Sequence, residues 1–185
     1  MGNEQQIWAP WRIGYIAGEA KSAPPLREPS NWLPQAEQTC FLCRAAASYE
    51  ADLDANRQNL VVAAGQQTLA ILNRYPYTNG HLLIAPLRHV GQFCDITDEE
   101  HLEAIHQLKR FNRLLSRLIS AEGFNIGLNL GKVAGAGVPG HLHWHLVPRW
   151  QGDNNFMPTL AGTRVISQSL EALWEDLVAA VKSEG

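Results

Sequence analysis

Short apolar runs, each about the length of a β-strand, follow one another along the chain from residue 60 onward. Residues 60–63 and 68–72 form two such runs separated by a glycine-containing turn, which predicts a β-hairpin. Further strands are expected over residues 81–85, where a proline ends the run, and over residues 125–130. Residues 141–147 alternate between polar and apolar side chains, which predicts a fifth strand with one buried face.

Two longer segments carry the three- and four-residue spacing of amphipathic helices. The first helix is expected to begin after Thr97, because Glu100 follows three residues later in a capping-box signature, and to end near Gly123. The second is expected from about Ser169 through Val178. The apolar positions are Leu102, Ile105, Leu108, Phe111, Leu115, Leu118 and Ile119 in the first helix and Leu170, Leu173, Trp174, Leu177 and Val178 in the second.

Together these elements predict an α+β fold. We expect a meandering, mostly antiparallel sheet of about five strands, one long helix and one C-terminal helix, with the helices on one side of the sheet. A length of 185 residues fits one domain. It divides into a Trp- and Pro-rich N-terminal arm over residues 1–40, a core over 41–150, and a loop and helix over 151–185. The aromatic residues of the arm favour packing on the body or on a partner chain over a disordered tail.

The overall composition limits the partners of the chain. With 45% hydrophobic and 18% charged residues it should fold as a soluble globule, and a net charge of −3 provides no basic field for a nucleic acid polymer. No apolar run is long enough to cross a membrane. The three cysteines, an odd number without a signal-peptide pattern, indicate a reducing cytoplasm rather than a disulfide framework.

The most informative feature is the set His141, His143 and His145, which share one face of the predicted strand while the intervening Leu-Trp-Leu side chains face the core. Imidazole suits proton transfer, nucleophilic attack and metal binding near neutral pH. The preceding segment Gly131–Gly140 contains four glycines, whose backbone N–H groups can approach an anion closely. The combination favours chemistry on a phosphate over a merely solvated row of histidines.

Several segments resemble one protein family. Residues 141–147 match the His-φ-His-φ-His-φ-φ signature of the histidine triad (HIT) superfamily, with tryptophan as the large apolar residue. Residues 72–89 are similar to its strand–loop–strand that ends in Pro-x-x-His, and residues 40–43 resemble the Cys-x-x-Cys of its zinc-bearing members. Residues 8–12 and 148–158 resemble the bacterial diadenosine polyphosphate phosphorylase and hydrolase branch. The resemblance implies a single HIT domain over residues 1–185, with its catalytic core in the central segment.

The resemblance also implies an enzyme that cleaves phosphoanhydride bonds in dinucleoside polyphosphates such as diadenosine tetraphosphate. His143 is then the nucleophile that attacks an α-phosphorus, and the covalent nucleotidyl-histidine is resolved by phosphate or water. His145 is expected beside the phosphate or leaving group as a hydrogen-bond donor or acid, and His141 holds structure or binds zinc. Two alternatives stay open: a nucleoside phosphoramidase that uses the same nucleophile, and a nucleotide-binding module without turnover.

A set of nucleotide contacts follows from the same resemblance. The expected contacts are Asn73 at the ribose, Leu72 beside the base, Asn129, Gly135, Gly137 and Gly140 at the phosphates, and Trp150 near the substrate. Core packing is the alternative for the tryptophan. Gly137 stands where the fragile-histidine-triad type has a glutamine, so only a backbone N–H can act at this position.

Cys40 and Cys43 have the spacing of a tetrahedral metal site. By the resemblance, His89 and His141 complete a structural Zn²⁺ site, and no organic cofactor is implied. Two buried thiols or a redox pair are the alternatives. The third cysteine, Cys94, is expected to be a small core residue. The resemblance further implies a homodimer that forms through a shared sheet and the long helix.

Overall fold

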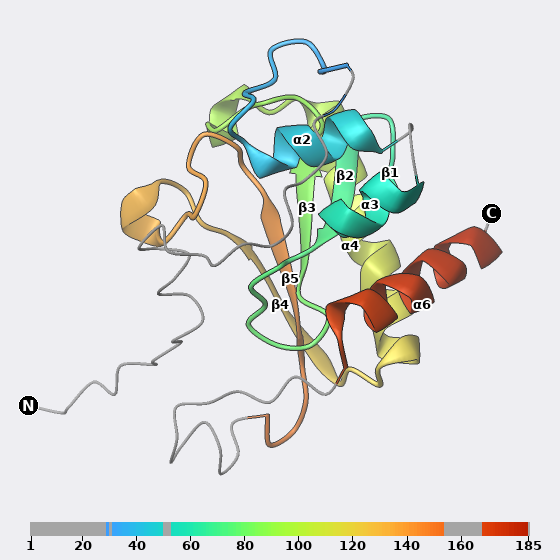
Figure 1. Cartoon of the computed structure of the whole chain (residues 1–185). Helices are drawn as coiled ribbons and strands as arrows, with labels where there is room; N and C mark the ends of the chain where they lie inside the picture. The colour runs from blue at the N-terminus through green and yellow to red at the C-terminus, as the bar shows by residue number, and fades with distance from the viewer. Residues whose placement is uncertain (1–28, 30, 50–52, 154–167, 185) are drawn as a thin grey trace, which may run out of the picture.

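The computed structural model describes residues 29, 31–49, 53–153 and 168–184 (Figure 1). Most of the predicted N-terminal arm, including its first two tryptophans and its tyrosine, lies outside the described residues. Trp32 belongs to the arm and packs, partly buried, against the hydrophobic core. For this one residue the expectation of a packed arm is confirmed.

Five strands form one sheet in the described part of the chain, as the sequence predicts. Their order is β1-β2-β3-β5-β4, and every neighbouring pair is antiparallel. The fifth strand begins later than predicted, at Trp144 instead of His141, so two of the three histidines precede it. The strands are β1 (Val61–Ala64), β2 (Thr68–Leu72), β3 (Leu82–Pro86), β4 (Gly123–Leu128) and β5 (Trp144–Arg149).

Two of the helices are the ones that the sequence predicts, α4 (Asp98–Leu118) and α6 (Leu170–Ser183). Two further α-helices in the described part of the chain, α2 (Phe41–Ser48) and α3 (Leu53–Asn59), are absent from the prediction. They contain 8 and 7 residues, about two turns each, which is too short for an apolar period to stand out from a loop. Both nevertheless turn out to matter for the functional site.

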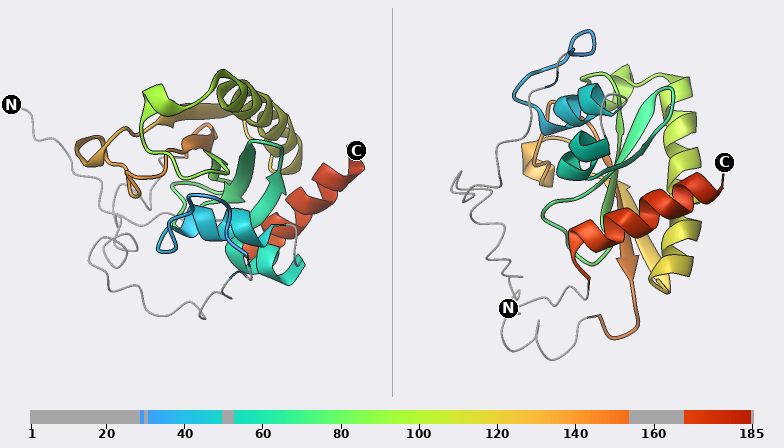
Figure 2. Two further views of the ribbon diagram at one scale, coloured as in Figure 1. Left: turned by 90° about the horizontal axis from the view of Figure 1, so that it is seen from above. Right: turned by 45° about the vertical axis from the view of Figure 1, so that its right-hand side comes forward.

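The helices cover both faces of the sheet, so the expectation of helices on one side is wrong. Figures 1 and 2 show α4 along one face and the short helices α2 and α3 over the opposite face. On the α4 side, the Trp144 ring meets the His101 ring with centroids 5.7 Å apart. Because both faces are covered, β2 and β3 are buried along their whole length.

The capping box predicted at the start of α4 is present. The backbone N–H of Glu100 donates to Thr97 Oγ1 over 3.2 Å, and the Thr97 N–H donates to the Glu100 carboxylate over 2.8 Å. Glu100 is buried, and Arg88 donates two hydrogen bonds to the same carboxylate, at 2.6 and 2.9 Å. This ion pair ties the segment that follows β3, and with it His89, to the helix.

The apolar residues between the histidines lie in the core, as predicted: Leu142, Trp144 and Leu146 are all buried. The prediction for Cys94 is wrong, since this cysteine is exposed. It lies in the short 3₁₀ turn η1 (Phe93–Asp95), which contains no buried residue. Cysteine is among the residue types most often buried, but residue type alone does not determine burial, and this turn lies at the surface.

The packing of α4 on the sheet leads to a direct test. Leu115 is fully buried, so Leu115→Ala leaves a cavity and should lower the free energy of unfolding by about 2–5 kcal/mol. Leu102 on the same helix is 59% exposed, so Leu102→Ala should change this free energy by less than about 0.5 kcal/mol. Urea denaturation followed by circular dichroism measures both variants. Equal losses would contradict the packing described here.

Candidate active site and metal centre

A cavity of about 250 Å³ lies where β2, β3 and β5 meet α2, the turn after α3 and the glycine loop. His143, His145 and the loop form one part of its wall, and mainly apolar side chains form the rest. Six of the residues predicted as catalytic groups or nucleotide contacts line it. The lining residues are Phe41, Asn59, Leu60, Ile71, Leu72, Asn73, Arg74, Tyr75, Tyr77, Leu83, Gly135, Gly137, Val138, His143 and His145.

His143 is buried, with one ring nitrogen held by the main chain. Its Nδ1 lies 2.8 Å from the carbonyl oxygen of His141, and only an N–H can pair with a carbonyl oxygen. The proton of the neutral ring is therefore on Nδ1, which leaves the Nε2 lone pair for attack on an electrophile. Burial also lowers the pKa of His143, and this favours the neutral, nucleophilic form.

His145 is held by His81, a residue for which the sequence suggests no clear partner. The Nε2 of the fully buried His81 lies 2.9 Å from the Nδ1 of His145. The Nδ1 of His81 accepts from the Tyr77 backbone N–H over 3.1 Å, and the Tyr77 ring stacks on it with centroids 4.7 Å apart. The side-chain nitrogen of Asn73 lies 3.3 Å from the same Nδ1. The second imidazole of the cavity is thus oriented by a third imidazole beneath it.

These contacts determine which nitrogens carry protons. A backbone N–H can only donate, so the Nδ1 of His81 is an acceptor and the proton of this ring is on Nε2. His81 therefore donates to the Nδ1 of His145, and the neutral His145 ring has its own proton on Nε2. This Nε2 lies 3.4 Å from Asn129 Nδ2. Two N–H groups cannot pair, so this tautomer requires the Asn129 amide to be assigned with its oxygen toward His145. His145 is thereby prepared as a proton donor.

The role of His81 depends on strand register, which explains why sequence reasoning misses it. His145 pairs with Leu83 across β3 and β5, and His81 lies two residues before Leu83, on the same face of the sheet. The two histidines are 64 residues apart in the chain. The sequence shows a histidine at the start of a predicted strand. Its partner can be identified only when the neighbouring strand and its register are known.

Three of the predicted nucleotide contacts, Asn129, Gly140 and Trp150, are not among the residues that line the cavity; Asn129 instead lies beside the Nε2 of His145. The indole N–H of Trp150 donates to the carbonyl oxygen of Ile119, 3.1 Å away beyond the end of α4. Gly140 lies beside the metal-ligand cluster, where a Cβ atom would come within 3.1 Å of the His89 Nε2. A glycine at this position leaves room for the His89 ring.

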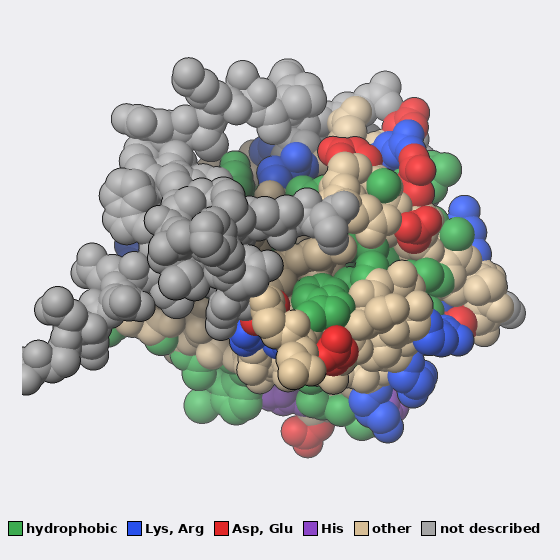
Figure 3. All heavy atoms as spheres, turned by 90° about the horizontal axis from the view of Figure 1, so that it is seen from below, with side chains coloured by type: hydrophobic (Ala, Val, Ile, Leu, Met, Phe, Trp, Pro, Cys, Tyr) green, Lys and Arg blue, Asp and Glu red, His purple; other side chains and the backbone are tan. Residues whose placement is uncertain are grey.

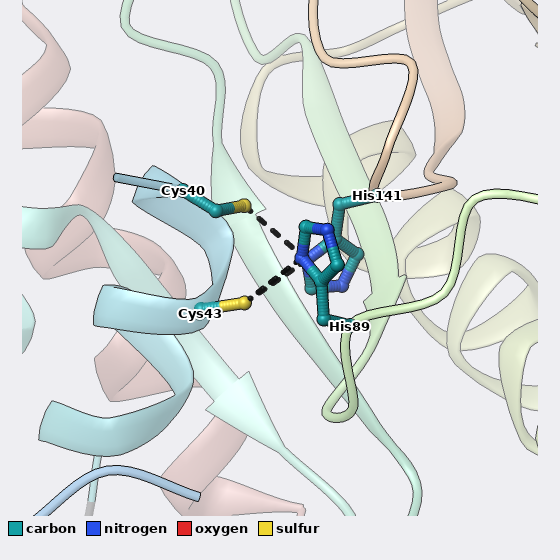
Figure 4. Close-up of side chains that lie close together, drawn as sticks. All are labelled: Cys40, Cys43, His89 and His141. Carbon is teal, nitrogen blue, oxygen red and sulfur yellow. Dashed lines mark hydrogen bonds between the residues drawn. The ribbon is translucent and has the colours of Figure 1, made fainter. Parts of the chain in front are cut away.

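The structure brings together Cys40, Cys43, His89 and His141, the four residues expected to bind zinc. Figure 4 shows both cysteines pointing from the start of α2 toward the two imidazole rings. Their ligand atoms all lie within 4.8 Å of one another. The Sγ atom of Cys43 is 3.2 Å from His89 Nδ1 and 3.5 Å from His141 Nδ1. Tetrahedral zinc with ordinary bond lengths separates sulfur and nitrogen ligands by about 3.5 Å, so the spacing fits this ion.

The protonation of His141 also suits a metal ligand. Its Nε2 lies 2.9 Å from the carbonyl oxygen of Pro86 and therefore carries the proton, which leaves the Nδ1 lone pair facing the two sulfurs. Burial lowers the pKa of His141 to about 4, so the ring is neutral at pH 7. Burial also raises the pKa of Cys43 to about 11, and a divalent cation is what would stabilise its thiolate. Zn²⁺ held here would connect α2 to the segments around β3 and β5.

Comparison with known proteins agrees with this geometry. Residues 55–152 match the family model described as the HIT domain. The chain belongs to the HIT family. An AP-4-A phosphorylase of Mycobacterium tuberculosis is 37% identical over 166 residues, which cover 90% of this chain and 78% of that protein. A bis(5'-nucleosyl)-tetraphosphatase (asymmetrical) of Schizosaccharomyces pombe is 33% identical over 84 residues, which cover 45% of this chain and 46% of that protein.

A solved structure bears on the metal centre of this HIT protein. It is a Zn-bound histidine triad family protein from Mycobacterium smegmatis, 27% identical, with a TM-score of 0.56. The match covers 68% of this chain and 85% of that chain. That protein is named as zinc-bound, and the four clustered residues of this chain could hold a metal ion.

The metal centre of this HIT protein makes a prediction that is separate from catalysis. Zn²⁺ added to chelator-treated protein should bind at about one equivalent and raise the melting temperature, because the folded chain alone holds the four ligands together. Cys43→Ser should abolish both effects, whereas Cys94→Ser, which changes an exposed cysteine outside the cluster, should retain them. Metal analysis and differential scanning fluorimetry measure the two effects. An unchanged zinc content in Cys43→Ser would exclude the site.

Proposed function

We propose that this HIT protein cleaves dinucleoside polyphosphates such as diadenosine tetraphosphate by nucleotidyl transfer to His143. The observation that carries the proposal is the unprotonated Nε2 of His143 at the wall of the cavity, beside the N–H of His145 and the glycine loop. The names of two relatives, an AP-4-A phosphorylase and a bis(5'-nucleosyl)-tetraphosphatase, agree with this substrate class.

In the first step the Nε2 lone pair of His143 attacks the α-phosphorus and forms a P–N bond. The bond from phosphorus to the bridging oxygen breaks, and the Nε2–H of His145 donates to that oxygen as it gains negative charge. Backbone N–H groups of the loop at Gly135 and Gly137 supply donors for the non-bridging phosphate oxygens. Through the carbonyl oxygen of His141, the metal centre would keep the nucleophile in its orientation.

For the second step we propose inorganic phosphate as the acceptor, because a relative that is 37% identical over 90% of this chain is named a phosphorylase. A phosphate oxygen attacks the same phosphorus, the P–N bond to His143 breaks, and a nucleoside diphosphate leaves. Diadenosine tetraphosphate then yields ATP from the first step and ADP from the second. Water as the acceptor would yield AMP in place of ADP.

Chromatographic analysis of the products from diadenosine tetraphosphate, with and without inorganic phosphate, tests both steps. We expect ATP and ADP with turnover that requires phosphate; ATP and AMP irrespective of phosphate would assign a hydrolase. Because the nucleophile is lost, His143→Ala should lower kcat by about a thousandfold or more without a change in circular dichroism. His106→Ala, an exposed residue on α4, is the control and should retain activity. Full activity in His143→Ala would refute the covalent mechanism.

We also propose that two chains form a homodimer through the open edge of the sheet. β4 is one of the two edge strands, the other being β1, and Ile126 on β4 is 52% exposed. An unpaired strand edge with an exposed apolar side chain is a surface that a partner chain can cover. Of the apolar stripe on the long helix, Leu108 and Leu115 are buried within this chain, whereas Leu118 is 40% exposed.

Ile126→Lys tests the dimer, because a charge on the shared edge would oppose pairing of the two strands. We expect light scattering after gel filtration to give a dimer for the wild type and a monomer for this variant. Leu53→Lys, at a position 58% exposed on α3, should remain dimeric. A monomeric wild-type protein would rule out the proposal.

We propose, finally, that the protein is cytoplasmic and has no nucleic acid partner. On the face drawn in Figure 3, lysine and arginine side chains lie interspersed with acidic ones, and the net charge is −3. Cys40 and Cys43 are free thiols, the state that a reducing compartment maintains and that a metal site requires. Among the described residues, no helix is both long and apolar enough to span a membrane.

A further inference from the structure

The apolar part of the cavity wall contains a buried polar side chain that the proposed mechanism does not use. Asn59 is the last residue of α3, is 7% exposed, and lines the cavity with Phe41, Leu60 and Ile71. A nucleotide whose α-phosphorus meets His143 would extend its base toward this part of the wall, because the flat, weakly polar base gains most from burial among apolar groups. Asn59 is therefore positioned beside the base rather than the phosphates.

The carboxamide of Asn59 has no hydrogen bond to any described residue. Other polar groups of the wall are engaged: the Asn73 amide contacts His81, and the Arg74 guanidinium donates to the carbonyl oxygen of residue 58. Neither its Oδ1 nor its Nδ2 is among the fully buried side-chain atoms that lack a partner, so both remain accessible at the cavity wall. A donor and an acceptor left unused at the wall of a cavity point to a bound molecule as the partner.

The backbone beside Asn59 is held in an uncommon conformation. Leu60 has a φ of 61°, in the left-handed region that a leucine rarely adopts. Its N–H donates to the carbonyl oxygen of Arg57 over 3.1 Å, and its own carbonyl oxygen accepts from Leu72 over 3.0 Å. This turn connects α3 to β1 and sets Asn59 and Leu60 side by side at the cavity. Such local strain is retained where the surrounding structure needs one particular geometry.

We propose that Asn59 recognises the base of the bound nucleotide and selects adenine; this inference rests on the proposed function. A carboxamide presents a donor beside an acceptor. Adenine has the complement on both of its polar edges, because its 6-amino group can donate to Oδ1 while N1 or N7 accepts from Nδ2. Guanine presents two acceptors, N7 and O6, on the N7 edge, so the match fails there. Its other edge, with O6 as acceptor and N1–H as donor, would also match a carboxamide, so selection requires the N6/N7 edge of the base to face Asn59. Asn59 is a specificity-determining residue in this scheme.

The ratio of kcat/KM for diadenosine over diguanosine tetraphosphate tests the inference. The wild type should favour the adenine substrate by roughly ten- to a hundredfold, the discrimination expected of a bidentate amide–adenine pair. Asn59→Leu is similar in size but cannot form hydrogen bonds, so the ratio should fall to about one through a higher KM for the adenine substrate. Asn59→Asp keeps the acceptor and loses the donor, and it should lower the ratio as well.

Asn56 supplies the matched control. It lies on the same helix, its amide donates to the carbonyl oxygen of Tyr49 over 2.8 Å, and it is not among the lining residues. Asn56→Leu should leave the base ratio unchanged. A wild-type ratio of about one, an unchanged ratio in Asn59→Leu, or an equal change in Asn56→Leu would overturn the inference.

These outcomes are distinct from those that test the proposed function. If turnover requires His143 but substitution of Asn59 leaves the kcat/KM ratio of the two substrates unchanged, the proposed function stands and the inference fails. If the wild type turns over neither substrate, the proposed function fails, and calorimetric binding of AMP and GMP to the same variants tests base selection by itself. Tighter binding of AMP that disappears in Asn59→Leu would support the inference, and equal binding of the two nucleotides would reject it.

Discussion

The hydrogen bond between His141 Nε2 and the carbonyl oxygen of Pro86 determines how the rest of the site is arranged. A buried imidazole needs a partner for its N–H, and this bond, 2.9 Å long, places the proton on the side away from the cysteines. The ring is thereby left with a lone pair toward Cys40 and Cys43, while the carbonyl oxygen of the same residue orients His143 over 2.8 Å. One residue thus joins the metal centre to the nucleophile.

The nucleophile and the proton donor differ in tautomer, although both are imidazoles with ring centroids only 5.0 Å apart. The Nδ1–H of His143 donates to a main-chain carbonyl oxygen, so its Nε2 is unprotonated. The Nδ1 of His145 accepts from His81, so its Nε2 is protonated. The backbone N–H of Tyr77 begins this chain of bonds. Because main-chain groups set both tautomers, the two roles do not depend on a large difference in pKa between neighbouring rings.

The short helices have a larger part in the site than their length indicates. Cys40 and Cys43 flank Phe41 in sequence, so the segment that supplies two sulfur ligands also supplies part of the cavity wall. The end of α3 supplies Asn59 to the same wall. Both helices lie over the face of the sheet opposite α4 (Figure 2). A metal ion bound at the start of α2 would therefore stabilise the region where the base is expected.

The sequence by itself determined the features that depend on near neighbours in the chain. The capping box of Thr97 and Glu100 was predictable because its two partners are three residues apart, and alternation identified Leu142, Trp144 and Leu146 as core. The tertiary structure alone decided the partner of His81, the position of Asn59 and the exposure of Cys94. Each of these depends on strand register or on helices too short to show a period, and contacts between distant segments leave no local pattern in the chain.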